Sequence, residues 1–151
     1  MADAHRLADI ESIKQLKARY LHLLDAKAWS EWSSLFAEDF VMEVADDFAG
    51  AGTMRGRDVA VASIRNWLGD TVTIHHAHNP VIEFMEDGRA RGLWSFEDRL
   101  YRSDGGRSHG FGHYHDEYRK SGGRWLIAAT RVTRLRLVRV RPGADPAAPS
   151  A

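Results

Sequence analysis

The sequence predicts an α+β protein in which three N-terminal helices pack on one face of a mostly antiparallel sheet. Before Gly69, apolar residues recur at helical spacing, whereas the chain after Gly69 reads as long strands separated by short turns that contain glycine. Helices that precede a run of antiparallel strands are typical of α+β folds, because the helices then cover one face of the sheet.

The helical part begins with a stripe of apolar side chains spaced three and four residues apart, which predicts an amphipathic first helix. A short second helix is predicted over 28–36, followed by a first strand over 39–45 whose residues alternate. A third helix is predicted over 56–69, with Gly56 and Asp58 at its start. The stripe of the first helix consists of Leu7, Ile10, Ile13, Leu16, Tyr20, Leu23 and Leu24.

Four long strands are predicted after the helices, over 71–86, 89–102, 107–120 and 124–140. The sequences EDG, SDGG and SGG separate them, and such pairs of Asp and Gly or of two glycines are typical of hairpin turns. We expect one domain over 1–141 and a disordered tail, rich in proline and alanine, over 142–151.

Composition limits the possible functions. The chain of 151 residues has 21 acidic and 21 basic residues, so no net charge draws it to nucleic acid or to an anionic membrane. Without cysteine it cannot form disulfides or thiolate metal sites. The charged N-terminus lacks the apolar core of a signal peptide, and no apolar run approaches the roughly 20 residues that span a bilayer. We expect a soluble, cytoplasmic protein.

Histidines cluster in the stretch TVTIHHAHNPVIEF, residues 71–84. On a strand, His75 points to one face while His76 and His78 share the other. A metal site on that second face needs a further ligand, and Glu83 has the wrong parity unless a bulge intervenes. We therefore predict no metal. In a second cluster, HGFGHYHDEY (109–118), the three histidines share one face of the strand, and Tyr114 and Asp116 lie on the other face. This arrangement favours an exposed polar face over a metal site.

Asp98 interrupts an otherwise apolar strand face formed by Ala90, Gly92, Trp94, Phe96 and Leu100. Either a bulge or strand end returns Asp98 to solvent, or the carboxylate lies inside a pocket, where a perturbed pKa suits acid–base chemistry. On the first helix, Tyr20 lies within the apolar stripe and Asp25 at its border. Taken alone, each is explained by a structural role, Tyr20 in the core and Asp25 at the helix end.

Four stretches together resemble a known family: IESIKQLKARYLHLLDAKAW (10–29), IHHAHNPVIEF (74–84), GLWSFEDRL (92–100) and HYHDEYRKSGGRWLI (113–127). In order and spacing they resemble the SnoaL-like branch of the nuclear transport factor 2-like superfamily. Within it, the chain is most similar to bacterial bile-acid 7α-dehydratases, and more distantly to scytalone dehydratase and the hexachlorocyclohexane dehydrochlorinases. The resemblance implies a cone-shaped α+β barrel whose curved sheet wraps a pocket.

The resemblance also implies a catalytic site of Asp25, His75, Tyr20, Asp98 and a C-terminal arginine, most nearly Arg134. Arg131 and Arg136 are alternatives to Arg134, and strand parity places Arg131 with Trp125 and Ile127. Tyr20 stands where the dehydrochlorinases have a lysine, which weakens a dehalogenase interpretation. Residues expected to bind substrate are Trp29, Trp67, Asn79, Trp94, Phe96 and Arg131.

These residues imply a cofactor-independent lyase or isomerase, and foremost a dehydratase. Asp25 would orient His75, which would act as a general base on a hydrophobic cyclic substrate such as a steroid, a polyketide ring or an aryl compound. The alternatives are a non-catalytic small-molecule-binding or assembly protein and a polyketide cyclase on the same fold. We expect a homo-oligomer, a trimer ahead of a dimer, since relatives of this type are commonly trimers.

Overall fold

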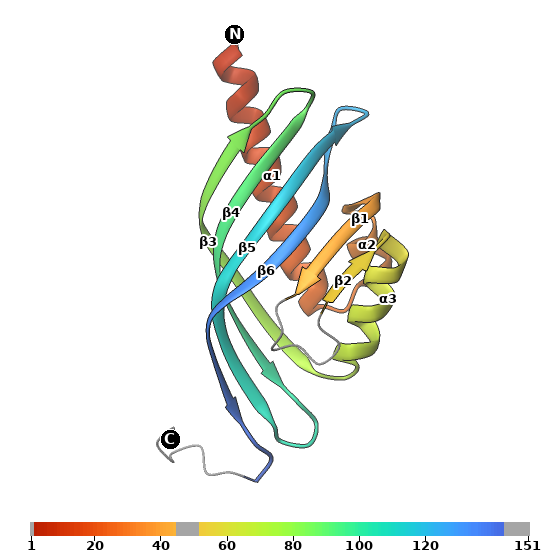
Figure 1. The fold of residues 1–151 in the computed structure, drawn as a ribbon, viewed down its shortest axis with the longest axis vertical. Coiled ribbons are helices and arrows are strands. Elements are labelled where there is room, and N and C mark those ends of the chain that lie inside the picture. Colours follow the sequence, from red (N-terminus) through yellow and green to blue (C-terminus); the bar gives the residue numbers. More distant parts are fainter. Residues whose placement is uncertain (1, 45–51, 144–151) are drawn as a thin grey trace.

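The computed structural model describes residues 2–44 and 52–143 and confirms the predicted fold class (Figure 1). Helices pack against a curved, mostly antiparallel sheet that remains open instead of closing into a barrel. The helices are α1 (Ala2–Asp25), α2 (Trp29–Ser33) and α3 (Arg57–Leu68), and the strands are β1 (Phe36–Val44), β2 (Gly52–Arg55), β3 (Val72–Phe84), β4 (Arg89–Tyr101), β5 (Arg107–Ser121) and β6 (Arg124–Val140).

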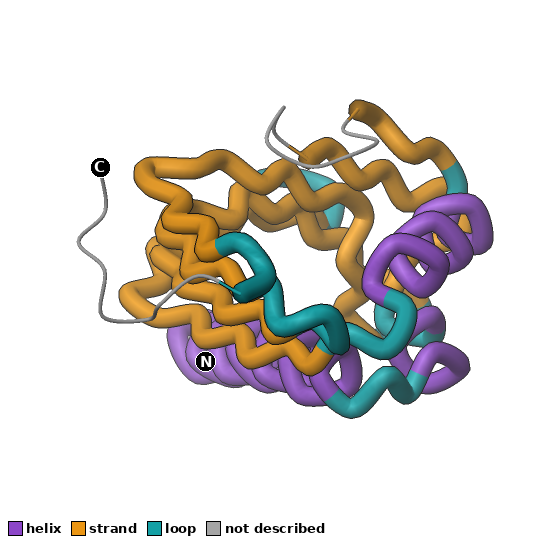
Figure 2. Tube along the Cα trace, turned by 90° about the horizontal axis from the view of Figure 1, so that it is seen from below, coloured by secondary structure: helices purple, strands orange, loops and turns teal. Residues whose placement is uncertain are grey.

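The six strands lie in the order β2-β1-β6-β5-β4-β3. All neighbouring strands are antiparallel except β1 and β6, which run parallel. The four long strands β3 to β6 bend around an interior that α1 and α3 flank, as the view along the molecule shows (Figure 2). One face of the sheet is therefore turned toward the helices.

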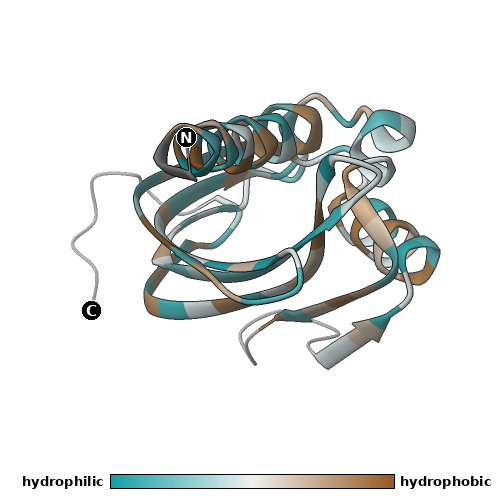
Figure 3. Ribbon diagram, turned by 90° about the horizontal axis from the view of Figure 1, so that it is seen from above, coloured by the Kyte–Doolittle hydropathy of each residue, from teal (hydrophilic) through white to brown (hydrophobic). Residues whose placement is uncertain are grey.

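That inner face is largely apolar, because most of the alternate strand residues that point toward the helices are hydrophobic. On β4, the residues Ala90, Trp94, Phe96 and Leu100 are buried while their neighbours are half-buried or exposed, as the alternation predicts. The sides of α1 and α3 that face the sheet are also predominantly hydrophobic (Figure 3). We call the opposite side of the sheet, which is turned away from α1, the outer face.

The turns follow the sequence prediction. Gly122 and Gly123 both have positive φ, 56° and 77°, in the hairpin between β5 and β6. Asp87 and Gly88, with φ of 61° and 67°, do the same between β3 and β4. In the two-residue turn of Gly122 and Gly123, positive φ at both positions matches the right-handed twist of the flanking strands, which explains these two glycines.

Two predicted boundaries were wrong. The second helix ends at Ser33 and not at Phe36, because Phe36 pairs with Ile127 of β6 and begins β1 three residues before the predicted strand. The short exposed strand β2 was not predicted, since its four residues show no apolar alternation. Residue 45 of the predicted first strand and residues 144–151 of the predicted disordered tail lie outside the described residues.

Within residues 2–44 and 52–143, no helix is both long enough and apolar enough to cross a bilayer.

Candidate active site

The C-terminus of α1 and the middle of β3 bring Asp25 and His75 together. The Nδ1 atom of His75 lies 2.6 Å from Oδ1 of Asp25, and the backbone N–H of His75 donates to Oδ2 at 2.9 Å. Both oxygens of the carboxylate are therefore bound by one residue, which fixes the carboxylate plane relative to the imidazole. The separation agrees with the hydrogen bond expected between an orienting carboxylate and a histidine base.

A third donor completes the surroundings of Asp25. The hydroxyl of Thr73 donates to Oδ1 of Asp25 at 2.9 Å. Burial favours the neutral acid, but the hydrogen bonds and charge of His75, with the Thr73 hydroxyl, outweigh it, so the pKa of Asp25 lies below its ordinary value. An ionised Asp25 is acceptor-only, so the proton between the two side chains resides on Nδ1 of His75. This tautomer leaves Nε2 with a lone pair that can accept a proton.

The ring of His75 lines a cavity of about 60 Å³ between the sheet, α1 and α3. The side chain of His75 is only 9% exposed, so little solvent reaches it. The cavity is lined by Tyr20, Leu24, Met42, Val44, Ile64, Trp67, Leu68, His75, Phe96, Asp98, Leu100, Tyr114, Val132 and Arg134.

The polar end of the cavity holds a bidentate ion pair. Nη1 and Nη2 of Arg134 donate to Oδ1 and Oδ2 of Asp98 at 3.0 and 2.8 Å. The guanidinium also lies over the ring of Phe96, 5.0 Å from its centroid. A Cβ atom at Gly110 on β5 would collide with both Arg134 and Asp98, so the glycine provides the space for the pair. Such a pair fixes the direction in which the guanidinium presents its remaining donors.

Tyr20 supplies a hydroxyl at the wall of the cavity. It is 1% exposed and packs edge-on against Tyr114, with ring centroids 5.9 Å apart. Burial, together with the negative charges of Asp116 and Asp25, raises the pKa of Tyr20 well above its ordinary value. The hydroxyl therefore keeps its proton and is able to donate a hydrogen bond.

Of the predicted site residues, His75, Tyr20, Asp98, Arg134, Trp67 and Phe96 line this cavity, and Asp25 is bonded to His75. Asp98 does face inward, and its partner is Arg134. Two predicted tryptophans lie elsewhere: Trp94 is buried with its indole N–H donating to Tyr118, and Trp29 packs on Trp32 outside the cavity.

Two further predicted substrate ligands lie away from the cavity because of β-bulges. On β6, Ile127 pairs with Tyr118 and Ala129 pairs with Glu117, so β6 has one extra residue between these two pairs. The extra residue moves the later side chains of β6 to the opposite face, and Arg131 therefore lies on the outer face of the sheet. On β3, the register shifts between His78 and Val81, and Asn79 is exposed there with a φ of 52°.

The same β3 bulge changes the position of Glu83, which joins His76 and His78 on the outer face. His76 and His109 instead contact the two oxygens of Glu97 at 3.2 and 3.1 Å. Among the described residues, no group of three or more histidine, aspartate or glutamate side chains is arranged to hold a metal ion.

A buried ionic network close to the cavity was not predicted from the sequence. Nζ of Lys17 lies 2.8 Å from Oδ2 of Asp116, and both side chains are essentially buried. Asp116 also accepts hydrogen bonds from Tyr118 and Thr130 at 2.7 and 3.0 Å. The signal was present in the sequence, because Lys17 falls on the apolar stripe of α1 and Asp116 shares the inward parity of Tyr114.

Comparison with known proteins identifies the family. The SnoaL-like domain model matches residues 5–131. The hexachlorocyclohexane dehydrochlorinase LinA-type3 from Novosphingobium barchaimii has a similar structure, with a TM-score of 0.81, 21% identity and coverage of 97% of this chain and 99% of that one. A candidate scytalone dehydratase from Novosphingobium aromaticivorans matches with a TM-score of 0.78 and 22% identity over 99% of this chain and 100% of the other. A protein of unknown function from Mycobacterium tuberculosis matches with a TM-score of 0.77 and 25% identity, covering 91% of this chain and 78% of that one. The chain belongs to the SnoaL-like domain family.

Proposed function

We propose that the protein is a cofactor-independent lyase, and specifically a dehydratase that acts on a cyclic hydroxy-ketone. The observation that carries the proposal is the 2.6 Å contact between Asp25 and His75, made by a histidine that lines an apolar cavity. A cavity that only binds an apolar ligand has no need of a carboxylate-oriented imidazole in its wall. The structural similarity to a dehydrochlorinase supports the fold on which such chemistry takes place.

The proposed reaction begins with proton abstraction. Nε2 of His75 removes a proton from the carbon next to the substrate carbonyl, and Asp25 stabilises the imidazolium that forms. The electron pair of the broken C–H bond moves toward the carbonyl, giving an enolate. Arg134, held in place by Asp98, lies at the polar end of the cavity, where its cationic group would stabilise the enolate oxygen.

Elimination then completes the reaction. The enolate electrons form the carbon–carbon double bond as the bond to the neighbouring hydroxyl group breaks. The imidazolium of His75 returns its proton to the departing oxygen, so that water leaves and the neutral base is restored. Tyr20, which keeps its own proton, would donate a hydrogen bond to that departing oxygen. No step requires a metal or an organic cofactor, and proton return to another carbon would give an isomerase instead.

The cavity narrows the expected substrate class. Its volume of about 60 Å³ is well below the roughly 300 Å³ at the lower end of small-molecule sites, so lining side chains must move when a substrate binds. A smaller substrate requires smaller movements of the side chains that line the cavity. We therefore expect single-ring substrates to be favoured over the steroid and fused-ring polyketide skeletons that the sequence also suggested.

A screen tests the proposal. The protein is incubated with single-ring and fused-ring cyclic ketones, and formation of the enone is followed by its ultraviolet absorbance. Each ketone is tested with and without a hydroxyl group on the β carbon, the second carbon from the carbonyl carbon. We expect turnover of hydroxylated single-ring ketones by the native protein and none by His75→Gln. Binding detected by thermal shift, without conversion of any hydroxylated ligand, would contradict the enzyme and favour a binding protein.

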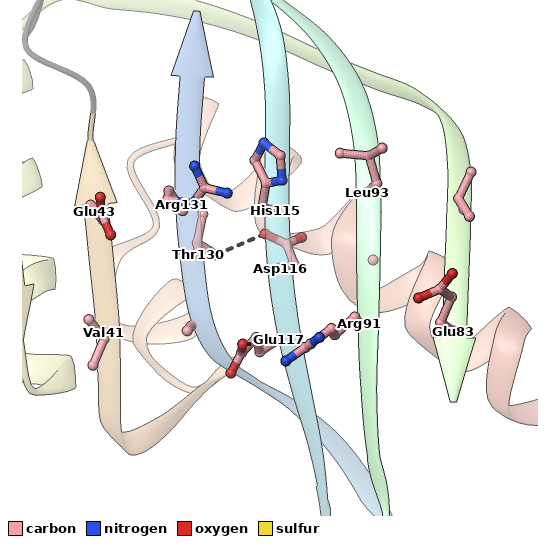
Figure 4. Close-up of a pocket in the computed structure, with 13 residues that line it drawn as sticks. Val41, Glu43, Glu83, Arg91, Leu93, His115, Asp116, Glu117, Thr130 and Arg131 are labelled. Carbon is pink, nitrogen blue, oxygen red and sulfur yellow. Dashed lines mark hydrogen bonds and ion pairs between the residues drawn. The ribbon is translucent and has the colours of Figure 1, made fainter. Parts of the chain in front are cut away.

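We also propose that the protein self-associates through the outer face of the sheet, as a trimer ahead of a dimer. A groove of about 560 Å³ crosses this face from β1 to β3 (Figure 4). Apolar side chains such as Leu93, 39% exposed, and Val81, 55% exposed, lie there beside the charged pair of Arg91 and Glu117. Exposed apolar side chains among complementary charges are typical of association surfaces.

Replacing Leu93 with aspartate is expected to lower the oligomer mass measured by light scattering at micromolar concentration, because the change buries an unpaired charge in the contact. Leu7→Asp is the matched control, since Leu7 is 66% exposed on α1, away from the outer face, and its replacement should leave the mass unchanged. A native protein that is monomeric at this concentration would refute the assembly.

A further inference from the structure

Lys27, two residues after the end of α1, has an unusual backbone conformation for its type. Lys27 has a φ of 57°, in the left-handed region. The N–H groups of Lys27 and Ala28 donate to the carbonyls of Leu24 and Leu23 at 3.1 and 3.0 Å and so close the helix. Glycine is the usual residue in this conformation, because a Cβ atom is disfavoured there. Lysine is therefore an uncommon residue at this position.

The side chain reaches the catalytic pair through one intermediate. Nζ of Lys27 donates to Oγ1 of Thr73 at 2.8 Å, and Thr73 in turn donates to Oδ1 of Asp25 at 2.9 Å. An ammonium group has donors only, so the Thr73 oxygen must accept from it and direct its single proton to Asp25. Thr73 is 4% exposed, which leaves its hydroxyl little access to competing water.

We propose that Lys27 is a positioning residue that acts through Thr73 on Asp25, keeping the shared proton on His75 and lowering the affinity of the imidazole for a second proton. The role rests on the proposed function, in which neutral His75 is the base. The positive charge of Lys27 partly offsets the negative charge of Asp25, which stabilises the imidazolium of His75. The presence of Lys27 therefore favours neutral His75. Burial lowers the pKa of Lys27 and the charge of Asp25 opposes this, which links the two groups electrostatically.

Other charged and titratable groups also face His75. Asp98 is its cross-strand neighbour on β4, and Arg134 of β6 is bound to Asp98. Tyr20 of α1 and Tyr114 of β5 line the same cavity. These groups remain in place when Lys27 is replaced, so a change in the titration of His75 would report the removed cation.

The test is an NMR titration of the His75 ring proton, which needs no substrate. The signal is assigned by its disappearance in His75→Gln. In Lys27→Met, we expect the midpoint of this titration to rise by about 0.5 pH unit, because the imidazolium loses a competing cation. Lys27→Arg, which retains the charge and the donors, should stay close to the native midpoint. Lys14→Met, at an exposed position of α1, is the control and should also leave the midpoint unchanged.

A double-variant comparison tests the path through Thr73. If the relay operates, Lys27→Met should shift the midpoint less in a Thr73→Val protein than in the native protein. An unchanged midpoint in folded Lys27→Met, or an equal shift in both backgrounds, would overturn the proposal. Because the titration is independent of turnover, a protein that converts no substrate would refute the proposed function and leave this result standing on its own.

Discussion

Replacing His75 with glutamine is expected to lower turnover by about 10²- to 10⁴-fold while leaving ligand affinity nearly unchanged. The base acts only as the proton is transferred, so its loss raises the barrier and not the dissociation constant. Turnover of the best substrate from the cyclic ketone screen and the midpoint of its thermal shift provide the two measurements. A loss of affinity as large as the loss of turnover would contradict a role confined to proton transfer.

The control for this substitution lies next to it on β3. His76→Gln makes the same chemical change at a histidine that also contacts a carboxylate, Glu97, but on the outer face of the sheet. We expect its turnover to remain close to that of the native protein. An equal loss in both variants would mean that the strand is disturbed and that no specific base has been removed.

Asp25→Asn should cost activity in the same range, because an amide can donate to Nδ1 and favour the wrong tautomer. Two groups that act as one unit give losses that do not add. The double variant should therefore lose little more than the worse single variant. Additive losses would show that Asp25 acts on its own.

Lys17→Met is expected to lower the free energy of unfolding by about 3–5 kcal/mol, because it leaves Asp116 buried without its cation. The pair is enclosed: Lys17 lies beneath the rings of Tyr114 and Tyr20, with Nζ 3.5 and 4.4 Å from their centroids. Burial lowers the pKa of Lys17, and the nearby carboxylate of Asp116 opposes this shift. Urea unfolding followed by circular dichroism measures the change.

A matched variant separates the buried pair from an effect of charge alone. Lys14→Met removes a lysine from the exposed side of α1 and should change stability by less than about 0.5 kcal/mol. Removing both partners, with Lys17→Met and Asp116→Leu together, should cost less than the sum of the single changes. A loss below about 1 kcal/mol in Lys17→Met would refute the importance of the pair.

Strand parity and family resemblance together indicated which residues lie near one another at the candidate site. Parity placed His75 on the opposite side of β3 from His76 and His78, which the cavity lining confirms. The position of Asp25 near His75 came from the resemblance, since the spacing of 50 residues between them contains no local signal. Both strand parity and the resemblance indicated Asp98, since the alternation of β4 predicted that its side chain points inward. In the structure its partner is Arg134.

The errors in assigning strand residues to a face of the sheet have a common physical cause. Parity holds only while the register is continuous, and one bulged residue moves every later side chain to the other face. A bulge in β6 reversed the predicted direction of Arg131, and another in β3 brought Glu83 to the outer face. Bulges depend on how two distant strands pair, so a single sequence carries little information about them. Lys27 was missed for a similar reason, since its partner Thr73 lies 46 residues away.

The central claim is that His75 removes a proton from carbon, and hydrogen–deuterium exchange measures that step directly. The compound is the cyclic ketone that binds best, in a form without the departing hydroxyl group. It is incubated with the protein in deuterium oxide, and NMR follows the incorporation of deuterium at the carbon next to the carbonyl. The account predicts exchange with native protein and His76→Gln, and exchange about 10²- to 10⁴-fold slower with His75→Gln. Exchange that is equally fast with His75→Gln, or a bound ketone that the native protein does not exchange, would contradict it.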